Sequence, residues 1–462
     1  MRNIFLLVQR GLTARNTVRS GLLERLLEDP DVQIVILVPP DGLDILRAEF
    51  TRPRVIVEPV PKITQGRFRR RIWIPFVRNL LFSETRRVMM VYGSGKMKRF
   101  SRWGYVVACI FYWPLSKLRC LRTLSHWCEM KFFRKREFDA LFEKYHPETV
   151  AIFSLLSTED IILMREAKRH GIRTVGMPKG WDALDKFNLE VMPDVLAAQN
   201  PKLTERAFKY HRFPKSAVKV VGFPFYDYFV KPEAIWTREE TCAKHGLDPT
   251  QPYLIYGSEG IWSKDELPVV QKLVDWMREG KFGRCSLVIR PYFGNVKNNP
   301  FGIFRDLPGV VVDDKHNVVN YFHDAWDPSI EEILRFANLM RHAACVVCVR
   351  STMSLDSAAL DIPCVNVGYS AYITDKGVDW TDKLYIHEFY QDVLKTGGVE
   401  YVANDQELLT AVQAMLRDPS LRQAGREKLR NELCFKIDGK AAARLAEAIL
   451  GEGLKSIDKR VK

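Results

Sequence analysis

Residues 344–369 read ACVVCVRSTMSLDSAALDIPCVNVGY, and this stretch decides the fold class. Apolar runs at 345–349 and 364–367 are typical of short buried strands, and the segment 354–360 between them fits a helix. Arg350, Ser351 and Thr352 lie where the first strand ends and the helix begins. Helix capping, which contributes ~1 kcal/mol, is one explanation for Ser351 and Thr352. The alternative is that these residues hold an anion at the strand exit.

The alternation of short apolar runs and amphipathic segments continues along the chain and favours parallel α/β layers. Strands are predicted at 4–8, 32–38, 55–57, 150–153, 174–177 and 195–198, and then at 253–256, 286–290, 310–312, 345–349 and 364–367. Further helices are predicted at 14–27, 158–170, 203–210, 266–279, 330–342, 405–417 and 421–433.

The chain divides in the middle, because the segment 222–241 is rich in Pro and aromatic residues. A chain of 462 residues is also too long for one hydrophobic core. We therefore predict two Rossmann-like domains that face a cleft, at 1–221 and 222–440, followed by a C-terminal tail at 441–462.

Several classes of protein are disfavoured. Neither half contains G-x-G-x-x-G or a P-loop, which argues against an NAD enzyme or an NTPase. The nine cysteines have no regular spacing, which favours a reduced, cytosolic compartment. Cys345 and Cys348 form a C-x-x-C inside an apolar strand without a second pair nearby, so no metal site is predicted. The first apolar stretch, Ile4–Val8, is too short for a convincing signal peptide.

Positive charge is concentrated between Lys62 and Arg136, where nineteen Lys and Arg residues accompany only two acids, Glu84 and Glu129. The whole chain carries +14, so the remainder is slightly acidic. Trp, Phe, Tyr and Leu residues are interleaved with these cations. Between Trp103 and Ser116 no residue is charged, but the run is shorter than the ~20 residues of a membrane-spanning helix.

Three interpretations of this basic segment compete. Aromatic residues at headgroup depth with cations on anionic lipid describe an interfacial membrane element. Basic and aromatic residues also suit single-stranded nucleic acid, but no nucleic-acid-binding motif accompanies them, so we predict no nucleic-acid partner. Core helices with snorkelling cations are the third possibility. We favour the first, with residues 62–136 as a helical insertion that contacts an anionic membrane.

Polar residues follow the predicted strands in both halves, where ligands of open α/β sheets bind. Arg15, Asn16 and Arg19 follow the first strand, and the loop after 174–177 contains Lys179, Gly180, Trp181 and Asp182. In the second half the corresponding residues are Gly257 and Ser258, then Arg290, and then Arg350, Ser351, Thr352 and Ser354. Two facing domains would direct both sets into one cleft, although turns, caps and packing explain each residue singly.

This chemistry fits a nucleotide-diphosphate sugar, used as substrate without a metal or other cofactor. Arg290 or Arg350 would neutralise charge on the leaving diphosphate, with hydroxyl donors from Ser351 and Thr352. A carboxylate of the other domain would deprotonate the acceptor hydroxyl, with Asp182 as the candidate and Asp160 or Glu159 as alternates.

Residues 4–50 and 150–430 resemble a group of bacterial GT-B glycosyltransferase-like proteins of surface carbohydrate synthesis. These proteins carry a Ser-Trp-Asp-Asn-Leu-Thr element, then Pro-Asp, then Gly-x-Pro-x-x-Asp at the entry to the second domain. The matching stretches here are 180–185 (GWDALD), 193–194 (PD) and 222–227 (GFPFYD). The stretches 14–27, 350–369 and 387–420 also look similar. Gly180, Ala183 and Tyr292 depart from the usual Ser, Asn and His, which puts a polar role at these positions in doubt.

The resemblance implies a GT-B fold and a hexosyltransferase-like enzyme of cell-envelope biogenesis, cytoplasmic and peripheral at the inner face of the plasma membrane. It would transfer a sugar to a lipid-linked or polysaccharide acceptor. The group is also distantly similar to UDP-N-acetylglucosamine 2-epimerase and CDP-glycerol glycerophosphotransferase. A sugar-nucleotide epimerase, a CDP-polyol phosphotransferase and a non-catalytic GT-B scaffold therefore remain alternatives.

Overall fold

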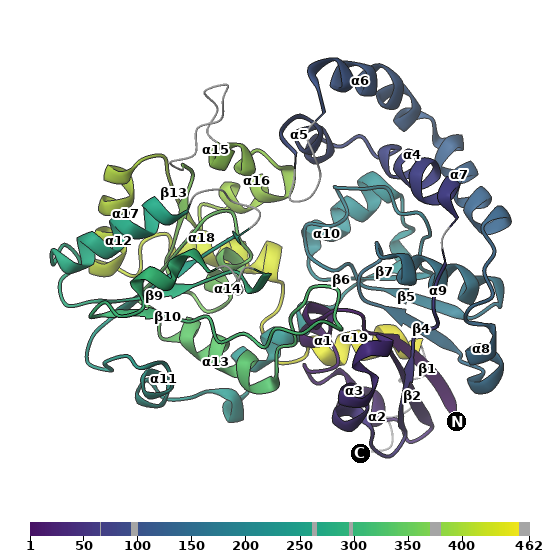
Figure 1. Cartoon of the computed structure of the whole chain (residues 1–462), viewed down its shortest axis with the longest axis horizontal. Helices are drawn as coiled ribbons and strands as arrows, with labels where there is room; N and C mark the ends of the chain where they lie inside the picture. The colour runs from purple at the N-terminus through teal and green to yellow at the C-terminus, as the bar shows by residue number, and fades with distance from the viewer. Residues whose placement is uncertain (65, 94–99, 261–265, 295–298, 370–379, 452–462) are drawn as a thin grey trace.

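Two parallel β-sheets organise the protein, and helices cover both faces of each sheet (Figure 1). The computed structural model describes residues 1–462 except 65, 94–99, 261–265, 295–298, 370–379 and 452–462. The first sheet has the order β3-β2-β1-β4-β5-β6-β7 and the second the order β10-β9-β8-β11-β12-β13. In each sheet the strand order reverses once, between β1 and β4 and between β8 and β11. Ligands of doubly wound sheets bind at such a reversal.

Short apolar strands build both sheets, because both faces of a parallel sheet are buried. The first contains β1 (Arg2–Leu7), β2 (Val32–Val38), β3 (Val55–Pro59), β4 (Thr149–Ile152), β5 (Arg173–Gly176), β6 (Val195–Ala198) and β7 (Val218–Val220). The second contains β8 (Tyr253–Gly257), β9 (Ser286–Arg290), β10 (Val310–Val312), β11 (Cys345–Cys348), β12 (Cys364–Val367) and β13 (Glu400–Val402).

In the first domain, alternate residues of β1 enter two separate cores. Ile4 and Leu6 pack in the core with α1 (Gly11–Asn16), α2 (Leu22–Leu27), α3 (Leu43–Phe50) and α19 (Ala441–Leu450). Phe5 and Leu7 face the opposite core, with α8 (Asp139–Tyr145), α9 (Thr158–Arg169) and α10 (Pro201–Arg206).

The second domain repeats this plan. One face of its sheet packs on α11 (Arg238–His245), α13 (Ile330–Arg341), α14 (Met353–Ala359), α15 (Trp380–Tyr385), α16 (Glu388–Lys395) and α18 (Gln423–Leu429). The other face packs on α12 (Leu267–Arg278) and α17 (Asp405–Arg417). The predicted fold class, two Rossmann-like α/β domains, is therefore confirmed.

The basic segment forms a helical insertion between β3 and β4, as predicted. It contains η2 (Arg69–Trp73), α4 (Ile74–Asn79), α5 (Glu84–Tyr92), α6 (Arg102–Lys117) and α7 (Arg119–Phe132). Helices α6 and α7 run along the outer edge of the first domain, at the upper right of Figure 1.

Several elements differ from the sequence-based prediction. The helix predicted at 14–27 is interrupted between α1 and α2, where Gly21 adopts a left-handed φ of 84°. Strands β7 and β13 were not predicted. Residues 441–450 of the predicted tail form α19, which crosses back to the first domain and is capped there by the carboxylate of Asp227. The predicted domain boundary at 221 stays a prediction, although the strands of the first sheet end at Val220.

Candidate functional site

The loops after β5 and β11 meet between the two domains. Trp181, which is only 6% exposed, belongs to the first domain but packs within a core of the second. Its indole Nε1 donates to Thr352 Oγ1 at 3.5 Å, and its ring centre lies 5.3 Å from that of Phe389. The structure thus brings the residues around Trp181 and those around Arg350 together.

Arg350 lies directly after β11, at the strand reversal of the second sheet. It is 9% exposed, and its Nε has no hydrogen-bond partner among the described residues. Its guanidinium carbon lies 5.1 Å from the centre of the Phe389 ring. Because buried charges in proteins are usually paired, a buried arginine with an unused donor indicates an anion-binding position.

A second arginine lies at the strand reversal of the first sheet. Arg10 follows β1 at the strand reversal, and within the described part of the chain its buried Nε also has no partner. It lines a narrow crevice together with Gln9, Ser154, Ser157 and Asp160. Asp160, an alternate candidate for the base, is buried and forms a capping box with Ser157 at the start of α9.

Four basic side chains act on the groups at this place: Arg10, Lys179, Lys186 and Arg350. Burial lowers the pKa of Lys179, and the nearby charge of Arg10 lowers it further. Burial, with the charges of Arg350 and Lys186, lowers the pKa of His387 to about 2, so this imidazole is neutral. Such a field favours a ligand with negative charge.

Two carboxylates at this place differ in protonation behaviour. Burial acts to raise the pKa of Asp182, but Lys186, which forms an ion pair with it, and Arg350 hold the pKa below its usual value. Burial raises the pKa of Glu259 to about 7 against the opposing charge of Arg350, and nearby Glu266 adds to the rise. Glu259 follows β8 and was not predicted as a site residue. The signal that could have identified it is the strand exit, which led to the prediction of its neighbours Gly257 and Ser258.

The other first-domain candidates have structural partners. Arg19 forms a bidentate ion pair with Glu49 and a second ion pair with Asp327, and it therefore joins the two domains. Asn16 accepts a hydrogen bond from Arg15 at 3.0 Å. The guanidinium of Arg15 lies 4.2 Å from the ring centre of Phe225 in the second domain. Arg19 and Arg15 therefore contact the second domain, and Asn16 contacts Arg15.

Four second-domain candidates also have local roles. Arg290 forms an ion pair with Asp313. Gly257 allows the close approach of Met353, whose sulfur would lie 2.1 Å from an added Cβ. Ser258 bonds to Glu266 within its own loop. Ser354 is fully buried and bonds to two core side chains, Tyr390 and Asn366, so its hydroxyl is not accessible to a ligand.

Ser351 and Thr352 remain beside Arg350. The hydroxyl of Ser351 accepts a hydrogen bond from the Met353 amide at 3.3 Å, as expected of a local cap. Thr352 is exposed and makes no side-chain cap bond, so capping does not explain its hydroxyl. Gly180 lies next to Asp182, whose carboxylate would be 2.8 Å from an added Cβ.

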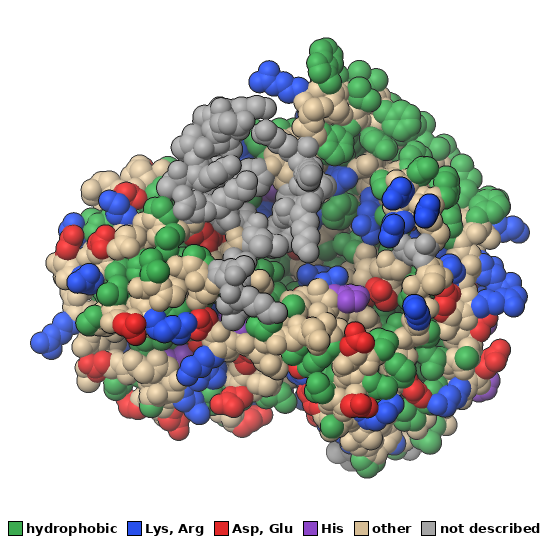
Figure 2. All heavy atoms as spheres, viewed as in Figure 1, with side chains coloured by type: hydrophobic (Ala, Val, Ile, Leu, Met, Phe, Trp, Pro, Cys, Tyr) green, Lys and Arg blue, Asp and Glu red, His purple; other side chains and the backbone are tan. Residues whose placement is uncertain are grey.

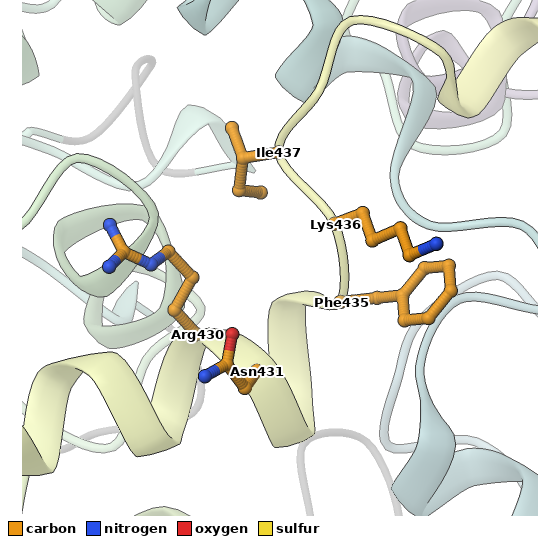
Figure 3. Close-up of a pocket in the computed structure, with 5 residues that line it drawn as sticks. All are labelled: Arg430, Asn431, Phe435, Lys436 and Ile437. Atoms are coloured by element: carbon orange, nitrogen blue, oxygen red, sulfur yellow. The ribbon is translucent and has the colours of Figure 1, made fainter.

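Metal-binding groups and surface hollows are the other possible sites. The described residues contain no group of three or more His, Cys, Asp or Glu side chains able to hold a metal ion. An open hollow on the connection from η10 (Arg430–Cys434) to α19 is lined by Arg430, Asn431, Phe435, Lys436 and Ile437 (Figure 3). It includes none of the strand-exit residues.

No protein-family model and no curated protein matches the sequence. Solved structures match nearly the whole chain. A UDP-GlcNAc 2-epimerase from Neisseria meningitidis bound to UDP-GlcNAc is 12% identical, with a TM-score of 0.53 and coverage of 97% of this chain and 100% of that one. The S. aureus protein MnaA, solved with UDP, is 10% identical, with a TM-score of 0.52 and coverage of 97% and 96%.

A variant of the wall teichoic acid polymerase TagF, soaked with CDPG, is 12% identical, with a TM-score of 0.51 and coverage of 100% and 90%. The fold is GT-B. These matches confirm the predicted distant similarity to UDP-GlcNAc 2-epimerases at the level of the fold. At sequence identities this low, the similarity concerns the fold alone.

Proposed function

We propose that the protein is a GT-B glycosyltransferase, which moves a sugar from a nucleotide-diphosphate donor to a lipid-linked or polysaccharide acceptor in bacterial surface carbohydrate biosynthesis. One observation carries this proposal: Arg350 is buried and has an unused donor at the strand reversal of the second sheet. A buried guanidinium N–H donor that is left unused costs free energy, and a diphosphate that accepts from it removes that cost.

The residues divide between the two substrates. Arg350, Ser351 and Thr352 would hold the diphosphate, and Lys186 would add charge compensation without a metal. Lys179, Gly180, Trp181 and Asp182 form the first-domain wall, where the acceptor would bind. Arg10, at the end of β1, extends this wall with a second unused donor.

The transfer needs a proton acceptor. As the acceptor oxygen bonds to the anomeric carbon, the bond from that carbon to the diphosphate breaks and the hydroxyl proton passes to a carboxylate. Glu259 suits this role better than Asp182, because a general base works best with a pKa near the working pH. Asp182 is held ionised by Lys186 and is a weaker base.

A panel of sugar nucleotides tests the proposed function. At a concentration of 100 Kd, the correct UDP-, GDP-, CDP- or dTDP-sugar should add ~2.7 kcal/mol to the free energy of unfolding and raise the melting temperature. Product assays with the stabilising donor then separate transfer from epimerisation. A response to CDP-glycerol alone would favour the polyol phosphotransferase, and no response to any nucleotide would favour the non-catalytic scaffold.

The pH profile identifies the base. If Glu259 accepts the proton, kcat/KM should fall about tenfold per pH unit below about 7, because the carboxylate must be ionised in the free enzyme. Glu259→Gln should lower kcat by ~10²–10⁴-fold and abolish this limb. A wild-type profile that is flat from pH 5 to 8, together with an inactive Asp182→Asn, would assign the role to Asp182 instead.

A further inference from the structure

Helix α6 turns its apolar face outward. Trp103, Val107, Ile110 and Trp113 recur at helical spacing and are exposed, Trp103 at 80% and Ile110 at 71%. Helix α7 adds exposed Leu124, Trp127 and Phe132. The space-filling view shows hydrophobic side chains gathered along this edge of the molecule, at the upper right of Figure 2. Soluble proteins rarely leave so many large apolar side chains together in water, so this surface has a partner.

The charge on the same surface selects the partner. The same helical segment carries exposed cations: Arg67, Arg70, Arg71, Arg102, Lys117, Lys131, Arg134 and Arg136. Of the two acids in residues 62–136, Glu84 pairs with Arg87, and Glu129 is buried in ion pairs with Arg69 and Arg165. The described part of this segment therefore presents no unpaired carboxylate to an approaching surface.

We infer that the outer face of α6 and α7 docks in the plane of an anionic lipid bilayer. Trp and Phe side chains would lie at headgroup depth, and the flanking Arg and Lys side chains would contact the lipid phosphates. Among the described helices, none is long and apolar enough to cross a membrane, which agrees with a helix that lies in the interface. Arg102 and Lys117 bracket α6, so both ends of its apolar stripe carry a cation.

The docking face is joined to the candidate site through the loop at residues 179–190. Thr85 of α5 donates to Asp185 at 2.9 Å and accepts from the Glu388 amide at 3.1 Å. Arg78 of α4 donates to Glu190 at 2.9 Å, and His126 of α7 lies 3.0 Å from the Leu189 carbonyl. Helix α7 of the docking face and the neighbouring helices α4 and α5 therefore support the loop of Asp182. If the proposed transferase function holds, docking brings this acceptor-side wall to a lipid-linked acceptor.

Vesicle flotation tests the docking directly. The full chain should float with phosphatidylcholine vesicles that contain about one third phosphatidylglycerol, more strongly at low than at high salt. Trp103→Ser/Ile110→Ser/Trp113→Ser should lower the partition coefficient at least tenfold. The matched control, Ile45→Ser/Ile303→Ser, removes exposed apolar side chains from other surfaces and should float like the wild type.

The charge component is tested separately. Arg102→Glu/Lys117→Glu should lose the preference for anionic over pure phosphatidylcholine vesicles while its thermal unfolding stays unchanged. The inference is overturned if the wild type remains at the bottom with anionic vesicles at low salt, or if the triple variant floats unchanged. It is also overturned if the wild type is a dimer that the triple substitution converts to monomers. The same holds if the wild type binds RNA and the triple variant does not. The sugar-nucleotide response of the triple variant should be unchanged, so failure of docking and failure of the proposed function give different results.

Discussion

Replacing Arg350 with Met is expected to weaken nucleotide binding far more than it destabilises the unliganded protein. Hydrogen bonds from a charged donor contribute ~1.5–3 kcal/mol each, so losing a bidentate contact to a diphosphate should weaken binding by ~10²-fold or more. The unliganded variant should lose less stability than a variant of a directly ion-paired buried arginine. Met removes a buried unused donor, although it also takes away positive charge that favours ionised Asp182 and Glu259. Calorimetric titration with the stabilising nucleotide and urea unfolding measure the two effects.

Arg290→Met is the matched control, since Arg290 also follows a strand of the second sheet. Its guanidinium pairs with Asp313, which would be left buried with a weaker contact to Arg335 at 3.7 Å. We therefore expect this variant to lose ~3 kcal/mol of stability while the folded fraction still binds nucleotide. The anion-site assignment is wrong if Arg350→Met binds nucleotide like the wild type, or if it is destabilised as much as Arg290→Met.

The fold was largely predictable because both faces of its strands are buried. Strands such as β2 (VQIVILV) and β9 (SLVIR) have apolar centres and were predicted with their observed bounds. Strands β7 and β13 contain Lys219 or Glu400 and are only three residues long, so they give no comparable signal. The break between α1 and α2 depends on the left-handed conformation at Gly21, which the helical pattern of 14–27 conceals.

The candidate site was predictable only in outline. Strand exits identified Arg19, Arg290 and Arg350 alike, and the sequence contained no means of separating them. Arg19 pairs with Asp327 and Arg290 pairs with Asp313, and each acid comes close to its arginine only when the chain folds. Arg350 stands out because the folded chain brings its Nε no partner among the described residues. The pKa of Glu259 likewise depends on burial, which no local pattern reveals.

Glu129→Gln is expected to cost ~3–5 kcal/mol of stability, although the sequence shows this residue only as an isolated acid among cations. In the fold Glu129 is 1% exposed and accepts from Arg69, Arg165 and the Trp73 indole. Arg69 also pairs with Glu190, at the end of the loop of Asp182. Removing one charge therefore leaves two buried arginines undercompensated and loosens the contact between α7, α9 and that loop.

Glu84→Gln is the natural control, because Glu84 is the other acid of the basic segment. Its ion pair with Arg87 is exposed, and surface pairs of this kind contribute ~0.5 kcal/mol or less. Urea unfolding of the two variants at pH 7 should therefore differ by several kcal/mol for the same chemical change. Equal stabilities would mean that the buried network contributes no more than a surface pair. Helix α7 would then be held to the first domain mainly by apolar packing.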